Sequence, residues 1–525
     1  MTDHNSDIVT ILLSGRIDST NAPQTEKMIQ EKLSGHEGSA VVLDASSLEY
    51  ISSAGLRIIL RIKKAHPDLT LTGVSSEVYE ILDMTGFTEM MTVEKAYRVV
   101  SIEGCEEIGR GANGTIYRID KDNVVKVYNN ADALADIQHE REVAKLALIL
   151  GIPTAISYDV VKVGNSYGSV FELLNARSFS KILASEPDKL DWCVDEFVKM
   201  LKKIHSTLVP SGKLPDMKEK ALSWARFTKE YLPAEAGAKL LSLVEAVPHD
   251  DHMIHGDYHT KNLELQGDEV LIIDMDTLSV GHPVFELGSM FNSFGGYSEW
   301  DHNVILKFQG FDLATGQAFW HKALSAYLET SCQAKIREVE DKARVIGYTR
   351  MIRRSIRRHG LETEDGRAEI ELWKSHLLSV LEHVDTLTFS LNELEIEATT
   401  DNLSEVQTFV NERLDALDCS PKAQMQIELA VEEVFINIAS YAYLPGKGNA
   451  TVRVEVTENP VSVTITFIDR GVPYDPLAKD DPDVTASAEN RAIGGLGVFM
   501  VKKTMDDVAY EYRDGQNILT LKKNL

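Results

Sequence analysis

The sequence lacks several features that would set it apart from ordinary globular proteins. No run of about 18 apolar residues occurs, and the N-terminus has no basic segment followed by an apolar one. The four cysteines lie far apart and form no Cys-x-x-Cys pair, which argues against a disulfide framework and a zinc site. We therefore expect a cytoplasmic protein whose cysteines are reduced and buried.

Positive charge is also scarce. The chain has 54 Lys and Arg against 81 Asp and Glu, a net charge of −27. Such a charge repels phosphate backbones and anionic lipid, so we expect neither nucleic acid nor membrane as a principal partner. The exception is segment 350–358, which contains Arg353, Arg354, Arg357 and Arg358. It is either a docking patch for an acidic partner or a solvated helix face, and the sequence leaves both open.

The length of 525 residues is too great for one hydrophobic core and predicts three or four domains. No internal repeat or low-complexity tract is evident, so the domains differ from one another. We expect a multidomain chain of α/β and α+β units, at residues 1–100, 101–370 and 393–525, with a linker at 371–392.

The first unit alternates strands and helices. Residues 8–18, 40–43 and 69–74 read as strands, and Tyr50-Ile-Ser-Ser-Ala-Gly-Leu56 opens a helix with one apolar face. This segment and the unit around it resemble the STAS domain of anti-sigma-factor antagonists, an α/β fold. The resemblance implies that Ser53 is a phosphorylation site for an anti-sigma kinase.

Two points about Ser53 stay open at this level. The family commonly has Asp before the phosphorylated serine and this chain has Ser52, so either serine is a candidate for modification. A serine at a helix start also caps backbone N–H groups without any further role. A phosphate there would place nearly two negative charges on an exposed surface, enough to break a docking interface.

The stretch from Ile254 to Asp276 carries the chemistry of the central unit. Asp257, His259 and Asn262 share one loop, and Asp274 follows at the end of an expected strand. In phosphoryl transfer one carboxylate orients the attacking hydroxyl, while an amide oxygen and a second carboxylate hold Mg²⁺. The Asp-x-x-x-x-Asn spacing resembles the loops of the protein-kinase-like superfamily, and its His-Gly-Asp form is similar to the aminoglycoside and choline kinase branch.

That resemblance implies a bilobal fold with Asp257 as catalytic residue, Asn262 and Asp274 as metal ligands, and His259 in the cofactor-binding set. Upstream, three glycines precede a strand that carries Lys126, which favours a phosphate-covering hairpin: Gly109, Gly111 and Gly114. Glu142 fits better than Glu140 as the ion-pair partner of Lys126, by its distance to the turn at 151–153, but Glu140 stays open.

The central unit also departs from the phosphotransferase pattern. Where that family usually shows Gly-Asp-Pro and then Asp-Leu, this chain has Gly281-His-Pro283 and then Glu286-Leu287. These departures bear on loop anchoring or substrate choice, and they leave the expected metal ligands in place.

The third unit carries a different nucleotide pattern. Glu433 and Asn437 lie one turn apart on an expected helix, and two antiparallel strands lead to Asp469-Arg-Gly471. A glycine-rich helix start follows: Gly494, Gly495 and Gly497. This order resembles the GHKL ATP-binding fold, an α/β sandwich, and in particular its anti-sigma-factor serine kinase branch.

The GHKL resemblance implies a role for each residue. Asn437 would bind Mg²⁺, Glu433 would activate the attacking group, and Asp469 would accept a hydrogen bond from adenine. Gly471 would let the backbone approach the base, and the three later glycines would present N–H groups to the phosphates of ATP. Many GHKL domains bind ATP only to bind a partner or to hydrolyse it, so kinase activity is a further step. A homodimer through this domain is usual in the serine kinase branch.

The combination suggests three functions. The first is a cytoplasmic bacterial partner-switching protein that transfers the γ-phosphate of ATP to serine of a STAS domain, its own or a partner's, in an anti-sigma/sigma-type pathway. The second is a phosphotransferase acting on a small alcohol, aminoglycoside or choline-like compound and regulated by the flanking domains. The third is a binding scaffold whose ATP sites only gate partner affinity.

Overall fold

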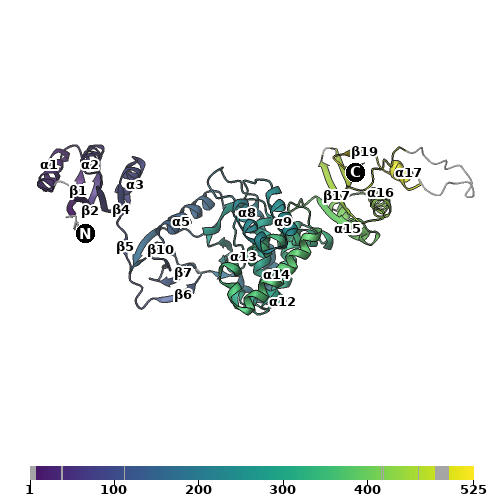
Figure 1. Ribbon diagram of the computed structural model, residues 1–525, viewed down its shortest axis with the longest axis horizontal. Helices are drawn as coiled ribbons and strands as arrows, with labels where there is room; N and C mark the ends of the chain where they lie inside the picture. Colours follow the sequence, from purple (N-terminus) through teal and green to yellow (C-terminus); the bar gives the residue numbers. More distant parts are fainter. Residues whose placement is uncertain are drawn as a thin grey trace, which may run out of the picture. The chain divides into compact units, whose positions relative to one another are not determined.

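The computed structural model describes residues 8–36, 39–111, 113–415, 417, 419–458, 460–478 and 496–525 (Figure 1). The chain divides into two compact units: residues 1–141 with 156–173, and residues 142–155 with 174–525. Each unit is described by itself. In the described part of the chain, every helix is too short or too polar to span a bilayer.

The first unit opens with a four-stranded parallel sheet in the order β1-β2-β3-β4. Its strands and helices are β1 (Ile8–Ile17), α1 (Ala22–Leu33), β2 (Ala40–Ile51), α2 (Ser53–Ala65), β3 (Thr70–Val74), α3 (Ser76–Met84), α4 (Phe87–Met90) and β4 (Thr92–Lys95). Side chains on β1 alternate, with Ile11 and Leu13 buried, and α2 buries Ile58 and Ile59 against the sheet. The alternating α/β pattern expected for this region is present.

The rest of the first unit is a six-stranded sheet in the order β5-β9-β10-β8-β7-β6. Its strands are β5 (Arg98–Val99), β6 (Glu106–Arg110), β7 (Gly114–Arg118), β8 (Asn123–Tyr128), β9 (Asp159–Val163) and β10 (Ser166–Glu172). Strands β6 and β7 pair antiparallel as the hairpin that the sequence predicts, with Gly109 in β6, Gly111 after it and Gly114 at the start of β7. Helix α5 (Leu134–Ile149) follows β8.

The second unit begins with a mostly helical region. Its helices are α6 (Phe179–Ser185), α7 (Leu190–His205), α8 (Met217–Thr228), α9 (Ala234–Ala246), α10 (Val284–Phe294), α11 (Val304–Gln309), α12 (Leu313–Leu328), α13 (Gln333–Arg357) and α14 (Glu364–His383). Two small sheets accompany them, made of β11 (Arg177–Ser178), β13 (Leu263–Gln266) and β14 (Glu269–Ile272), and of β12 (Met253–Ile254) and β15 (Ser279–Val280). One large core joins these helices, with Phe197, Phe294 and Phe319 in mutual contact.

Residues 371–392 are not the linker that the sequence analysis expects. Most of them continue helix α14, where Trp373 and Leu377 are buried in the core of the helical region. Their four-residue spacing places both side chains on one face of the helix, which packs against α13. Val384 and Leu387 extend the same core beyond the end of the helix.

The C-terminal part of the second unit is a five-stranded antiparallel sheet in the order β16-β17-β18-β20-β19. Its elements are β16 (Glu393–Glu397), α15 (Leu403–Asp415), α16 (Pro421–Asn437), β17 (Asn449–Glu458), β18 (Val461–Asp469), α17 (Leu496–Thr504), β19 (Asp507–Arg513) and β20 (Gln516–Asn524). Phe409 and Phe435 from the helices and Phe467 from the sheet share one core, as expected for an α/β sandwich.

A buried cluster of charges joins helix α13 to strand β16. The Glu338 carboxylate pairs with Lys335 Nζ at 2.8 Å and with Lys342 Nζ at 2.6 Å, and it accepts the backbone N–H of Glu395. The side chains of the two lysines are 1% and 4% exposed and that of Glu338 is 9% exposed. Charges this deeply buried need their partners, so the cluster fixes the end of α13 on the C-terminal sheet.

All four cysteines are free thiols, as expected. Cys193 and Cys332 are buried, whereas Cys105 and Cys419 are only partly buried, so the expectation that all four are buried is wrong for two of them.

Candidate active sites

The hairpin of β13 and β14 brings three of the predicted site residues together. Its register pairs Leu263 with Ile272, and one step further the Asn262 carbonyl accepts the Ile273 N–H at 2.9 Å. Asn262 and Asp274 therefore lie at the same end of the hairpin. Asn262 Nδ2 donates to the Asp257 carbonyl at 3.0 Å, which ties the loop start to this end.

Asp274 has an unusual backbone. Its φ of 64° and ψ of 63° lie in the left-handed region, which a residue with a side chain adopts at an energetic cost. A short 3₁₀ turn, Met275–Thr277, follows at once. Strained residues of this kind concentrate at functional sites, and here the strain turns the chain sharply at an expected metal ligand.

Asp257 lies beside an imidazole and a guanidinium group. Its side chain is 40% exposed, with His259 Nε2 at 3.5 Å and a guanidinium nitrogen of Arg350 at 4.0 Å. Burial acts to raise its pKa, but the hydrogen bond to His259 and the charges of His259 and Arg350 bring the pKa of Asp257 down to about 2. The carboxylate is therefore ionised at neutral pH and suited to orient a hydroxyl.

Glu286 holds the catalytic loop in place through hydrogen bonds to its backbone. It is fully buried at the start of α10, and its carboxylate accepts the backbone N–H groups of His255, Gly256 and Tyr258. Burial raises the pKa of Glu286 to about 7, against the lowering effect of these N–H groups. In the sequence, Glu286 stands out only as a departure from the family pattern. The feature of the sequence that could have identified Glu286 is an acidic residue within an otherwise apolar segment, Val-Phe-Glu-Leu.

Lys126 pairs with Glu140, so the preference for Glu142 is wrong. Lys126 Nζ lies 2.9 and 3.0 Å from the two Glu140 oxygens, and the Tyr128 hydroxyl donates to the same carboxylate at 2.6 Å. Residues 140 and 142 point about 200° apart around a helix, so only one of them can face β8. The lysine and glutamate side chains are 15% and 12% exposed, which makes this a largely buried ion pair.

The oxygen donors of this loop fit a magnesium ion. Mg²⁺ commonly takes one or two protein carboxylates and completes its shell with water and substrate phosphates. Asn262 Nδ2 donates its hydrogen bond to the Asp257 carbonyl, so Oδ1 is the atom of this side chain that can bind a cation. Asp274 supplies a carboxylate. The described residues hold no group of three or more His, Cys, Asp and Glu that would form a complete protein site. His259 Nδ1 is buried and has no hydrogen-bond partner within the described residues.

The C-terminal sheet carries a second site. Asn437 Nδ2 donates to Glu433 Oε1 at 2.9 Å across one turn of α16, so the amide Oδ1 is again the atom left for a cation. The chain then forms a π-helical turn, Ile438–Ala442, a feature often found at functional sites. Gly497, at the start of α17, lies so close that any side chain there would overlap the Glu433 carboxylate. The predicted Gly494 and Gly495 lie outside the described residues.

Asp469 is held by a residue that the sequence analysis did not select. Its Oδ1 accepts Asn517 Nδ2 at 2.8 Å and the Gly471 N–H at 2.9 Å, and both Asp469 and Asn517 are buried. Within the described residues Oδ2 has no donor, so it is the atom suited to a ligand amino group. Gly471 lies against the Ala442 carbonyl, where a Cβ would come within 2.3 Å. The glycine therefore also allows this close packing.

The two candidate serines of the first unit differ in their surroundings. Ser52 is the N-cap of α2, and its hydroxyl accepts the Ala54 N–H at 3.2 Å. Ser53 is the first residue of the helix and is exposed. Capping thus accounts for Ser52, and Ser53 presents the accessible hydroxyl at the positive end of the helix.

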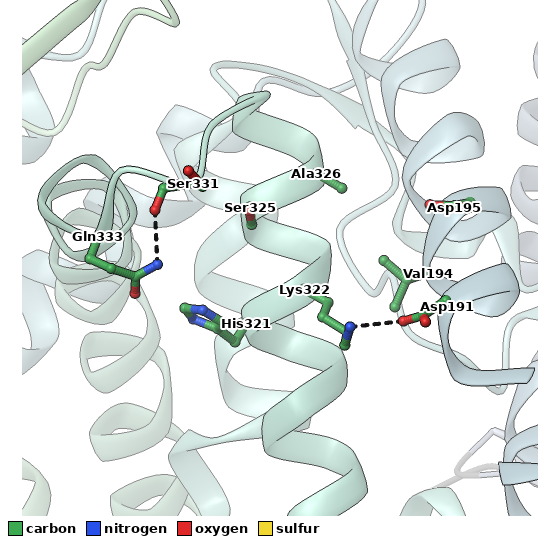
Figure 2. A pocket seen from close by; sticks show the side chains of 9 residues that line it. All are labelled: Asp191, Val194, Asp195, His321, Lys322, Ser325, Ala326, Ser331 and Gln333. Carbon is green, nitrogen blue, oxygen red and sulfur yellow. Dashed lines mark hydrogen bonds and ion pairs between the residues drawn. The ribbon is translucent and has the colours of Figure 1, made fainter. Parts of the chain in front are cut away.

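A cavity of about 420 Å³ lies elsewhere in the helical region, between α7, α12 and the start of α13 (Figure 2). Two contacts lie between its lining residues: Lys322 Nζ is 2.8 Å from Asp191, and the Gln333 amide donates to the Ser331 carbonyl. None of the predicted site residues lines it.

Three family models match different parts of the chain. A model of the STAS domain matches residues 1–100, one of the phosphotransferase enzyme family matches 104–319, and one of the histidine kinase-like ATPase domain matches 396–523. The chain is 34% identical to the anti-sigma factor antagonist BtrV of Bordetella bronchiseptica, over 85 residues, 15% of this chain and 72% of BtrV. It is 30% identical to the serine-protein kinase RsbW of Listeria monocytogenes, over 108 residues, 20% of this chain and 68% of RsbW.

The chain belongs to the anti-sigma-factor antagonist and RsbW-type serine-protein kinase families. A further relative is the serine/threonine-protein kinase BtrW of Bordetella bronchiseptica, 29% identical over 102 residues, 19% of this chain and 71% of BtrW. The three resemblances stated from the sequence are thereby confirmed. Among solved structures, the chain is similar to a thermostable mutant of aminoglycoside phosphotransferase APH(4)-Ia, at 11% identity and a TM-score of 0.38, over 53% of this chain and 94% of that one. A likeness this distant says nothing about the substrate.

Proposed function

We propose that this chain is a partner-switching protein that carries both a kinase and its target. In this proposal the C-terminal site binds ATP and transfers the γ-phosphate to Ser53 of a STAS domain, in the same chain or in another copy. The observation that carries it is Ser53 itself, an exposed hydroxyl at the start of α2 in a chain that also contains an RsbW-type kinase region. BtrV and BtrW, which are separate proteins in one bacterium, both have counterparts here.

The residues of the C-terminal site support the reaction as follows. Asp469 Oδ2 accepts a hydrogen bond from the adenine amino group, since Asn517 and Gly471 already hold Oδ1. Asn437 Oδ1 supplies an oxygen for Mg²⁺, which when bound neutralises charge on the phosphates. The Glu433 carboxylate takes the proton of the serine hydroxyl while the Oγ–Pγ bond forms, and the bond between Pγ and the leaving ADP oxygen breaks.

Phosphate at Ser53 acts as the switch. It adds nearly two negative charges at an exposed surface that carries an uncharged hydroxyl before the reaction. A partner surface that fits the unmodified helix start loses contact and meets repulsion, so binding weakens. The partner in this proposal is an anti-sigma or sigma-type protein, as the names of the relatives suggest.

A second function is proposed for the central site, which transfers phosphate from ATP to the hydroxyl of a separate acceptor. The observation that favours it is that Asp257, Asn262 and Asp274 are gathered on one loop and hairpin, with Glu286 anchoring the loop. The resemblance to protein-kinase-like proteins, taken by itself, proposes Lys126 as the residue that contacts the nucleotide phosphates, and within its own unit Lys126 is held by Glu140.

The two sites are separated by one experiment. The full chain is incubated with γ-labelled ATP and Mg²⁺ beside Asn437→Ala and Asp257→Ala variants, and label in protein and in small molecules is measured. The proposal expects label on Ser53 that disappears with Asn437→Ala and persists with Asp257→Ala. Ser53 label that survives Asn437→Ala would overturn the assignment of the C-terminal site.

A further inference from the structure

The catalytic loop of the central site faces cations that its own chemistry does not require. Helix α8 begins against this loop, because a Cβ at Gly256 would lie 3.1 Å from the Met217 methyl group. Lys220 and Trp224 follow Met217 by one and two turns and so lie on the same face of α8. Helix α13 brings Arg350 to the same place, with its guanidinium carbon 5.5 Å from the Trp224 ring centre.

Arg350 is fixed in position by the loop. Its Nη1 donates to the Gly256 carbonyl at 3.2 Å and to the Ser289 hydroxyl at 2.6 Å, and Nη2 lies 4.0 Å from Asp257 Oδ1. Ser289 in turn donates to the Gly256 carbonyl. The guanidinium is thus held beside the carboxylate that would orient the acceptor hydroxyl, with further N–H groups left for a ligand.

Lys220 is the second cation. It is partly buried, and its ammonium group forms no hydrogen bond or ion pair within the described residues. Burial lowers the pKa of Lys220, the positive charge of Arg350 lowers it further, and Asp276 opposes both. Arg350 already lies 4.0 Å from Asp257, whereas Lys220 has no carboxylate within ion-pair distance among the described residues, so an anion beside Lys220 would be favourable.

These positive charges contrast with the net charge of the whole chain, which is −27. A cationic acceptor such as an aminoglycoside or choline would meet repulsion from Lys220 and Arg350. An anionic group would satisfy both.

We propose that the central site acts on an alcohol that carries a phosphate or carboxylate group, which Lys220 and Arg350 bind while Asp257 orients the hydroxyl. The inference rests on the proposed phosphotransfer function of the central site and adds the class of acceptor. Trp224 forms the apolar wall beside the two cations and provides a signal for their occupation.

The test uses the full chain with its nucleotide sites saturated with Mg²⁺ and ADP, and inorganic phosphate as the probe. Phosphate replaces chloride at constant ionic strength, and tryptophan fluorescence is followed. The expected result is a saturable change that is lost in Trp224→Phe, with an apparent Kd at least tenfold weaker in Lys220→Met and in Arg350→Met. Arg226→Met, an exposed cation on the same helix, serves as the control and is expected to match the wild type.

Lys220→Met is the decisive variant, because Lys220 makes no structural hydrogen bond whose loss could disturb the loop. Equal phosphate affinity in Lys220→Met and wild type would overturn the inference, as would a saturable response to choline chloride instead of phosphate. The proposed phosphotransfer function fails on a different result, namely unchanged ATP consumption in Asp257→Ala measured in an Asn437→Ala background.

Discussion

Asn517 donates a hydrogen bond of 2.8 Å to Asp469 across 48 residues of sequence, inside the core of the C-terminal sheet. The side-chain oxygen of Asn517, Oδ1, accepts hydrogen bonds from the Tyr510 hydroxyl and the Tyr474 N–H. Strands β18 and β20 place Asp469 and Asn517 opposite each other, so the pairing follows from their register. The amide thereby fixes which carboxylate oxygen of Asp469 faces a nucleotide.

Replacing Asn517 with Ala is expected to weaken nucleotide binding at the C-terminal site by roughly ten- to hundredfold. A hydrogen bond to a charged group contributes about 1.5–3 kcal/mol, and its loss frees Asp469 to rotate. Calorimetric titration of ADP in an Asp274→Ala background measures this site apart from the central one. Gln516→Ala changes the neighbouring residue of the same strand, on its other face, and should leave the affinity within twofold. Equal affinities for both variants would contradict the assigned role of Asn517.

Glu140→Gln is expected to lower ATP consumption by the central site at least tenfold, whereas Glu142→Gln should leave it nearly unchanged. Only Glu140 holds the Lys126 ammonium group, and Tyr128 orients that carboxylate. Both variants are assayed in the Asn437→Ala background, so that the C-terminal site is silent. A larger loss with Glu142→Gln than with Glu140→Gln would contradict the pairing in the structure.

Glu286 is expected to make the stability of the helical region depend on pH. The pKa of Glu286 is about 7 in the folded chain against an ordinary value of 4.5. Its contribution to the free energy of unfolding is therefore fully present below about pH 4.5 and is lost as pH rises through 7. A shift of this size corresponds to about 3 kcal/mol. Relative to Glu286→Gln, which cannot titrate there, the wild type should lose up to about 3 kcal/mol of unfolding free energy between pH 5 and pH 8.

The chain offers a convenient measurement of this effect. All five tryptophans lie between residues 192 and 373, within the helical region, so guanidinium unfolding followed by tryptophan fluorescence reports that region. Glu219→Gln, a change at an exposed glutamate of α8, is the control and should show the wild-type pH dependence. If wild type and Glu286→Gln lose stability in parallel across this range, Glu286 is not the titrating group.

Glu338→Gln is expected to destabilise the helical region by about 3–5 kcal/mol. The change removes the carboxylate that Lys335 and Lys342 share. Lys342 keeps Glu395 at 3.5 Å, but Lys335 loses its only ion pair within the described residues, and an uncompensated buried charge is costly. The same fluorescence measurement applies. Lys199→Met removes an exposed ion pair with Glu196 and should change stability by less than about 1 kcal/mol. A comparably small effect of Glu338→Gln would show that the buried cluster does not hold α13 on the C-terminal sheet.

The parts of the fold that the sequence predicts well are those where local spacing carries the information. Asp257 and Asn262 lie five residues apart on one loop, and Glu433 and Asn437 lie one turn apart on one helix, so their neighbours in sequence are their neighbours in space. The alternation of strands and helices over the first 100 residues is equally local. The STAS and GHKL resemblances rest on such short-range patterns.

The predictions fail where a side chain depends on register or on distant segments. Glu140 and Glu142 differ by two positions, and only the packing of α5 on β8 decides which one faces Lys126. Asn517, the partner of Asp469, is on strand β20. Glu286, which accepts the Gly256 N–H and holds the loop, is on helix α10. The segment 371–392, expected as a linker, includes the end of helix α14, where Trp373 and Leu377 are buried against distant parts of the helical core.

Mass-spectrometric mapping of phosphate on the full chain tests the central claim most directly. Wild type, Ser53→Ala, Ser52→Ala and Asn437→Ala proteins are incubated with ATP and Mg²⁺, alone and with Ser53→Ala mixed with Asn437→Ala to detect transfer between copies. The account predicts phosphate on Ser53 in wild type and Ser52→Ala and none in Asn437→Ala alone. Phosphate on Ser52 in place of Ser53, or modification of Ser53 that is undiminished by Asn437→Ala, would contradict it.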